Sequence, residues 1–287
     1  MADVMGWPPS ASGEDKASLW SWKRRDEGDC RSRRDRRGRY GFRHRGPSGN
    51  AFIDRGHATF RAIKYAPFPV VGALAGMAFG GGCEILLHCS AIQAHAEASI
   101  GLVETKIGVV PGWGGCKEML IRQYALTAAP HGPVAPAIAA FNLIASARVS
   151  GSAFEARNLG LLRVTDGITM NRDRLLADAK RKALDLVPGY SAPERPKIAL
   201  AGLSGAPAIR NLLDSEVIAG RATAHDRVVG IALIDTLTGG VSADPLKPVG
   251  EDEITAMEKR AFIALCGTPG TVARVKHMLA TGKPLRN

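Results

Sequence analysis

The 287-residue chain has few cysteines, few aromatic side chains and no long apolar run, and each shortage excludes a class of protein. Five cysteines are too few for a disulfide framework, so we expect a cytoplasmic protein. The longest apolar stretch, residues 68–83, is rich in glycine and shorter than the roughly 20 residues that a transmembrane helix needs. Residues 1–21 lack the apolar core of about 7–15 residues that a secretory signal peptide requires.

Positive charge is in excess, at a formal +11, but it is concentrated at one end of the chain. Residues 23–45 hold eleven lysines and arginines, and Val4 and Leu19 are the only Val, Leu or Ile in the first 50 positions. Such a segment buries too little apolar surface to offset its ordering entropy. We therefore expect residues 1–51 to be a disordered arginine-rich prefix that is not native to the fold, for example an out-of-frame translation joined to a genuine domain.

Several binding motifs are missing from the sequence. It contains no G-x-x-x-x-G-K-[ST] loop, no G-x-G-x-x-G turn between strand and helix, and no G-x-S-x-G elbow, so no NAD site is visible. Cysteines and histidines gather between Cys83 and Cys116, but without a C-x-x-C pair we predict no metal site. A nucleic-acid-binding arm is the alternative interpretation of the prefix, since arginine-rich tails bind phosphates. We do not expect a nucleic acid as partner, and we expect no membrane span.

From about Phe52 to residue 190, helical and extended patterns alternate, which predicts an α/β domain. In order, the patterns predict a helix ending at Pro67, a buried strand over 69–74, a glycine-rich turn over 76–82, a helix over 83–89, short strands over 91–96 and 99–103, a loop over 110–115, and helices over 117–124 and 136–147. Ser152 and Asn171 predict the starts of two further helices, the second ending at Pro188.

The rest of the chain has an almost wholly helical pattern. A proline-rich segment opens a linker over residues 191–205, and Thr223 and Thr268 predict helix starts beyond it. We therefore expect an α/β domain over residues 52–190, a linker over 191–205 and a helical region over 206–287.

Two glutamates stand in apolar, glycine-rich surroundings. Glu84 follows a triple glycine, and Glu104 lies between two apolar runs. A buried carboxylate is costly unless it is paired, hydrogen-bonded or used, so two of them make an acid/base pair conceivable. The alternative for Glu84 is a solvent-facing position on a half-exposed helix. Glu84 and His88 are four residues apart, and we expect them to form a surface or lining pair rather than a zinc site.

These segments resemble the crotonase (enoyl-CoA hydratase/isomerase) superfamily. The resemblance runs through residues 69–87 and 100–115, and more weakly through 149–187. The region from 206 to Asn287 resembles the end of multifunctional fatty-acid oxidation proteins that also carry a 3-hydroxyacyl-CoA dehydrogenase. The resemblance implies a crotonase-like (ββα) spiral domain, truncated at its N-terminal end, followed by an all-helical extension.

The resemblance also implies a site and a reaction. In the family, the N–H of the residue matching Gly81 holds the thioester oxygen of an acyl-CoA. Glu84 would activate water and Glu104 would deliver a proton as water adds to a 2-enoyl-CoA in fatty-acid β-oxidation, without a cofactor. The surrounding substrate-pocket loop comprises Gly80, Gly82, Pro111 and Gly112.

One part of the family pattern is missing. A second donor to the thioester oxygen is expected about forty residues before the triple glycine, and residues 35–45 do not match it. Loss of one such donor costs about 10²–10³ in kcat, so we expect impaired hydration. The alternative is a non-catalytic acyl-CoA-binding or assembly subunit derived from a multifunctional protein. In either case we expect a homo-oligomer, as is common in the family.

Overall fold

The computed structural model describes residues 33–34, 40–41, 49–126 and 132–287. The chain divides into two compact units, Met1–Phe52 and Ile53–Asn287. In the first, β1 (Arg33–Arg34) pairs antiparallel with β2 (Tyr40–Gly41). Most of the prefix that we expected to be disordered lies outside the described residues. The same is true of the segment 35–45, which does not match the family, except for residues 40–41. Helix α3 (Gly49–Lys64) begins before the expected break at residue 52.

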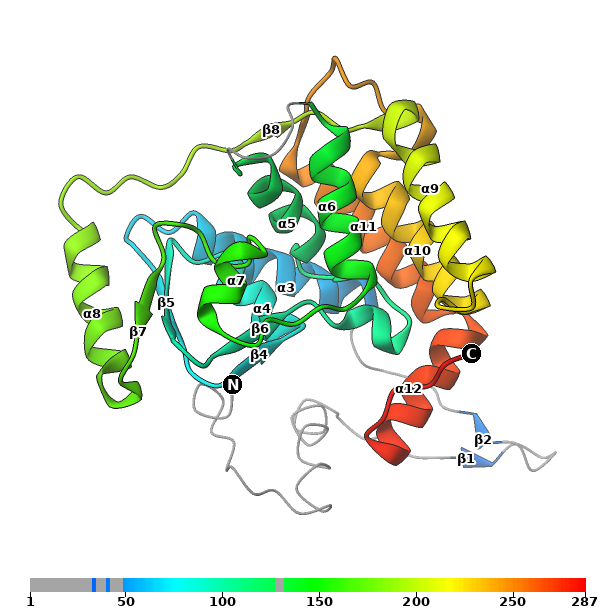
Figure 1. Ribbon diagram of the computed structural model, residues 1–287, viewed down its shortest axis with the longest axis horizontal. Coiled ribbons are helices and arrows are strands. Elements are labelled where there is room, and N and C mark those ends of the chain that lie inside the picture. Colours follow the sequence, from blue (N-terminus) through cyan, green and yellow to red (C-terminus); the bar gives the residue numbers. More distant parts are fainter. Residues whose placement is uncertain (1–32, 35–39, 42–48, 127–131) are drawn as a thin grey trace. The chain divides into compact units, whose positions relative to one another are not determined.

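Two sets of parallel strands form the α/β part of the second unit (Figure 1). One is a three-stranded sheet in the order β3 (Val71–Leu74), β5 (Ala91–His95), β7 (Gly167–Thr169). The other pairs β4 (Met77–Phe79) with β6 (Ser99–Gly101). Strand β4 lies inside the segment expected to be only a turn, because the positive φ angles of Gly76 and Gly80 place the turns at its two ends.

Helices connect and cover these strands, as the alternating pattern predicts. They are α4 (Gly81–Leu87), the 3₁₀ helix η2 (Glu104–Ile107), α5 (Gly115–Tyr124), α6 (Val134–Ala145), α7 (Ala153–Asn158), the 3₁₀ helix η3 (Arg172–Arg174) and α8 (Leu175–Leu186). The Ser152 hydroxyl accepts a hydrogen bond from the N–H of Glu155, which confirms the predicted cap of α7. Asn171 caps η3 rather than α8 itself, because a 3₁₀ turn precedes the long helix.

The C-terminal region is helical, as expected. Its elements are β8 (Lys197–Ile198), α9 (Gly202–Ile218), α10 (Ala224–Thr238), the 3₁₀ helix η4 (Gly240–Ser242), β9 (Val249–Gly250), α11 (Glu251–Cys266) and α12 (Pro269–Thr281). Thr223 and Asp226 form a reciprocal capping box at the start of α10, and the Thr268 hydroxyl caps α12. The predicted fold class, α/β followed by a helical extension, is therefore confirmed.

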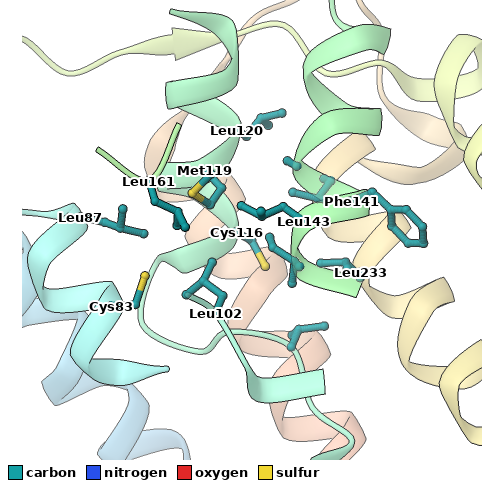
Figure 2. Close-up of a cluster of buried hydrophobic side chains, with 14 of the residues drawn as sticks. Cys83, Leu87, Leu102, Cys116, Met119, Leu120, Phe141, Leu143, Leu161 and Leu233 are labelled. Carbon is teal, nitrogen blue, oxygen red and sulfur yellow. The ribbon is translucent and has the colours of Figure 1, made fainter. Parts of the chain in front are cut away.

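The α/β part and the C-terminal helices share one hydrophobic core (Figure 2). Helices α5 and α6 pack against α10, and α11 also contacts α5. Side chains of this core include Cys83, Leu87, Leu102, Cys116, Met119, Phe141, Leu161 and Leu233. Each fully buried leucine contributes about 1.5–3 kcal/mol, so the shared core ties the C-terminal helices to the strands. No helix in the described part of the chain is both long and apolar enough to span a membrane.

Candidate active site

Glu84 is buried at the start of α4, with 2% of its surface exposed, so the solvent-facing alternative is wrong. Its Oε1 accepts hydrogen bonds from the main-chain N–H groups of Trp113 at 2.8 Å and Gly115 at 2.9 Å. Burial raises the pKa of Glu84 to about 7, although the two main-chain donors and the charge of Lys117 oppose the shift. Its carboxyl group can therefore gain or lose a proton near neutral pH.

Glu104 begins η2 and brings a second buried carboxyl group to this place. Within the described residues, neither of its carboxylate oxygens has a hydrogen-bonding partner. A methyl group added to Gly80 would lie 3.2 Å from Oε1 of Glu104, so this carboxyl group lies close to the glycine turn that starts α4. Burial, followed by the charge of Glu84, raises the pKa of Glu104 well above its usual value. The structure therefore brings the two predicted acids together and favours the protonated form of Glu104.

A third buried glutamate, Glu258 of α11, adjoins the pair and was not predicted. Its carboxylate accepts hydrogen bonds from the main-chain N–H groups of Gly114 at 2.5 Å and Cys116 at 3.1 Å. Burial and the charge of Glu84 raise the pKa of Glu258 to about 8. A sequence signal for it exists, because Glu258 interrupts the buried stripe of α11 between Ile254 and Leu265.

The remaining predicted site residues lie around the start of α4. Gly81 is the first residue of this helix, and a methyl group there would lie 3.0 Å from Cζ3 of Trp113, so the indole ring packs directly on it. The same indole makes an edge contact with the ring of Phe60, with centroids 5.6 Å apart. Trp113 and Phe60 were not singled out from the sequence.

The predicted pocket loop is tightly covered in this structure. Gly80, Gly82, Pro111 and Gly112 are all buried. A methyl group at Gly112 would lie 2.8 Å from the ring of Phe262, which shows that α11 packs on this loop.

Two pockets lie beside the site, and neither includes Glu84 or Glu104 among its described lining residues. His57 and Arg61 of α3 line both pockets, the smaller of which also reaches Trp113 and Lys117. The carboxyl groups of both acids are buried, and Trp113 lines the smaller of these pockets.

Next to the acids lies a buried ion cluster, consisting of Lys64, His88, Lys117, Glu118 and Glu251. Nζ of Lys64 lies 2.7 Å from Oε1 of Glu118 and 2.8 Å from Oε2 of Glu251. Nζ of Lys117 lies 3.0 Å from Oε1 of Glu118. His88 belongs to this cluster and not to a pair with the Glu84 side chain, since its Nδ1 lies 2.7 Å from the main-chain oxygen of Glu84. Among the described residues, no three His, Cys, Asp or Glu side chains are placed to hold a metal ion.

Comparison with known proteins bears on this geometry. Residues 47–131 match the sequence model of the enoyl-CoA hydratase/isomerase family. This part of the chain therefore resembles the enoyl-CoA hydratases/isomerases. The "probable 3-hydroxyacyl-CoA dehydrogenase" of Bacillus subtilis is 39% identical over 236 residues, which cover 82% of this chain and 29% of that protein. The "putative fatty acid oxidation complex trifunctional enzyme" of Rickettsia felis is 45% identical over 67 residues, 23% of this chain and 9% of that protein.

The chain thus spans only a minor part of the length of these curated relatives. The predicted resemblance to the crotonase superfamily is confirmed by the family match over residues 47–131. Among solved structures, a putative enoyl-CoA hydratase from Streptomyces avermitilis is 19% identical with a TM-score of 0.47, covering 79% of this chain and 61% of that one. An enoyl-CoA hydratase from Mycobacterium avium subsp. paratuberculosis is also 19% identical with a TM-score of 0.47, covering 78% and 69%. The roles of Glu84, Glu104 and Gly81 stay predictions.

Proposed function

We propose that the chain is an enoyl-CoA hydratase that adds water to a 2-enoyl-CoA. The observation that carries the proposal is geometric: two carboxyl groups are buried beside the glycine turn that starts α4, Glu84 with two main-chain donors and Glu104 next to Gly80. The pKa of Glu84 is raised to about 7, whereas burial and the charge of Glu84 raise the pKa of Glu104 well above its usual value. Near neutral pH, Glu84 is then available as a general base while Glu104 stays protonated as a general acid. Hydration needs one group of each kind.

The proposed reaction moves two protons and forms two bonds. Ionised Glu84 takes a proton from water as the oxygen bonds to Cβ of the enoyl chain. Electrons of the Cα–Cβ double bond shift toward the thioester, and protonated Glu104 gives its proton to Cα. The product is a 3-hydroxyacyl-CoA, with Glu84 protonated and Glu104 ionised, so proton transfer from Glu84 to Glu104 restores the starting state.

The thioester oxygen carries the developing negative charge in this reaction. By the family resemblance we assign its stabilisation to the N–H of Gly81, which is the first residue of α4 and has no acceptor within the helix. Gly81 also lets the backbone approach the substrate closely, since it carries no Cβ. Displacement of the Trp113 ring from Gly81 would open this position to the substrate.

The names of the relatives fit a place in fatty-acid oxidation. Hydration of a 2-enoyl-CoA yields a 3-hydroxyacyl-CoA, which is the substrate class in the name of the Bacillus subtilis relative. Hydration changes no oxidation state overall, and we propose that it uses no cofactor. The start of α4 does not fit the pyrophosphate of NAD, because Glu84 places a carboxyl group in the first turn of this helix, where a dinucleotide fold binds that group.

Hydration of crotonyl-CoA by the purified chain tests the proposal. We expect Glu84→Gln and Glu104→Gln each to lower kcat by about 10²–10⁴, because each removes one proton-transfer group without changing side-chain size. Glu97→Gln is the control, since Glu97 lies between the two acids in sequence and is exposed. Hydration that neither site substitution affects would refute the site.

The enclosed site favours a second candidate, a non-catalytic acyl-CoA-binding or assembly subunit. Trp113 packs on Gly81, and the neighbouring pockets are lined by other residues. Binding of a CoA thioester without any hydration, measured by calorimetry on the intact chain, would support this candidate over the enzyme. In both cases we propose a homo-oligomer, which light scattering on the same sample would test.

A further inference from the structure

The main chain of residues 113–116 donates hydrogen bonds to Glu84 and also to Glu258. Successive main-chain N–H groups of this segment alternate between the two carboxyl groups. Those of Trp113 and Gly115 donate to Glu84, and those of Gly114 and Cys116 donate to Glu258. A shift of the segment that breaks the bonds to one carboxyl group therefore disturbs the bonds to the other.

The segment needs such support because its conformation is demanding. Gly114 has a φ of 104°, which only glycine adopts readily, and a methyl group there would lie 2.8 Å from the His88 ring. Four of its main-chain N–H groups would be buried without an acceptor if the two carboxyl groups were absent, and each unsatisfied buried donor is costly. Glu258 supplies acceptors for two of them from α11, far along the chain.

We propose that Glu258 is a positioning residue, which fixes the 113–116 segment and thereby the orientation of the Glu84 carboxylate. The proposal rests on the hydratase function for its catalytic consequence. Glu258 would act through Glu84, because both carboxyl groups accept hydrogen bonds from the same segment.

The charge of Glu258 is coupled to its surroundings. Carboxyl groups of Glu84 on α4 and Glu104 on η2 face it, as do the ammonium group of Lys117 and the thiol of Cys116 on α5. The two carboxyl groups disfavour its ionised form and Lys117 favours it. Glu84 and Glu258 therefore titrate as a pair rather than as independent groups.

The first arm of the test is steady-state hydration of crotonyl-CoA by Glu258→Gln. We expect kcat to fall about 10- to 100-fold with KM changed less than twofold, because misplacing a catalytic group costs rate rather than substrate affinity. The wild-type pH profile should also show the two ionisations of the Glu84–Glu258 pair, which the variant reduces to one. Glu258→Asp, which keeps the charge, should recover part of the lost kcat.

Asp166→Asn is the matched control. Asp166 is also buried and also accepts main-chain hydrogen bonds, from Ile92 at 2.9 Å and Arg163 at 2.7 Å, but it binds a different segment. We expect this variant to keep both the wild-type pH profile and KM. A Glu258→Gln enzyme with unchanged kcat and an unchanged profile would overturn the proposal.

The second arm does not depend on catalysis. Amide hydrogen exchange over residues 111–120 should be at least about tenfold faster in Glu258→Gln, including at the two amides that donate to Glu84, and unchanged in Asp166→Asn. Faster exchange in a protein that shows no hydration would reject the hydratase function and retain the positioning role. Unchanged exchange would reject the positioning role whether or not the protein hydrates crotonyl-CoA.

Discussion

Two groups of buried acids lie side by side in this protein and differ in what surrounds them. Glu84, Glu104 and Glu258 have main-chain donors or no partner, and burial raises the pKa of each. Glu118 and Glu251 of the ion cluster are also buried, but each contacts lysine ammonium groups. Burial alone would raise their pKa values too, yet the charges of the lysines outweigh it and lower both.

The comparison shows that the charged partner, not burial, separates a structural acid from one suited to proton transfer. Acids of the ion cluster stay ionised across the neutral range and cross-link α3, α5 and α11. Glu84 and Glu258 can exchange protons near neutral pH, whereas Glu104 favours its protonated form; such raised pKa values are a property of catalytic groups. Lys117 interacts with both groups, because its charge also lowers the pKa values of Glu84 and Glu258.

The largest expected effect comes from breaking the ion cluster. Lys117→Met removes one of two lysines that balance Glu118 and Glu251, and leaves uncompensated negative charge in the interior. We expect a loss of about 3–5 kcal/mol in the free energy of unfolding, measured with urea. Lys106→Met, which removes an exposed lysine of η2, should change it by less than about 0.5 kcal/mol. Equal losses in the two variants would contradict the structural role of the cluster.

The raised pKa values of Glu84, Glu104 and Glu258 should make the free energy of unfolding depend on pH. Since their folded pKa values are raised, the folded state binds more protons than the unfolded state above about pH 4.5, and stability falls as pH rises. Burial lowers the pKa of His88 to about 4, which works in the opposite direction below about pH 6.5. We therefore expect the clearest decline between pH 6.5 and 8, measured by urea unfolding, with about 2 kcal/mol of it coming from Glu84 and Glu258 together.

Substitutions in the two groups should affect this decline differently. The double variant Glu84→Gln/Glu258→Gln should lose the part of the decline that these two groups provide, about 2 kcal/mol, and keep the part that Glu104 provides. Glu118→Gln should lower stability at every pH in this window but keep the slope, because the lowered pKa of Glu118 places its own titration below the window. A slope that disappears in Glu118→Gln and persists in the double variant would reverse the assignment of the two groups.

Local patterns in the sequence predicted much of the fold and two of the three site acids. Caps at Ser152, Thr223 and Thr268 involve residues three apart, so the sequence displays them directly. The apolar, glycine-rich frames around Glu84 and Glu104 correctly indicated burial. What the sequence did not reveal depends on contacts between distant segments.

The ion cluster illustrates this limit. Lys64 and Glu251 are 187 positions apart, and nothing near either one indicates a buried partner. Glu258 is an intermediate case, because the rule that pointed to Glu84, an acid within an apolar stripe, applies equally to α11. Its partners at residues 114 and 116 are main-chain groups, which leave no residue-type signature.

The smallest expected effect compares the two lysines of the ion cluster. Lys64 contacts the same acids as Lys117, but its side chain is 13% exposed against 7%, so water can partly replace its charge. We expect Lys64→Met to cost about 1–2 kcal/mol in urea unfolding, less than Lys117→Met. Lys259→Met, which breaks the exposed pair with Asp54, should cost about 0–1 kcal/mol. If Lys64→Met costs more than Lys117→Met, then Lys64 rather than Lys117 provides most of the compensation for the buried acids.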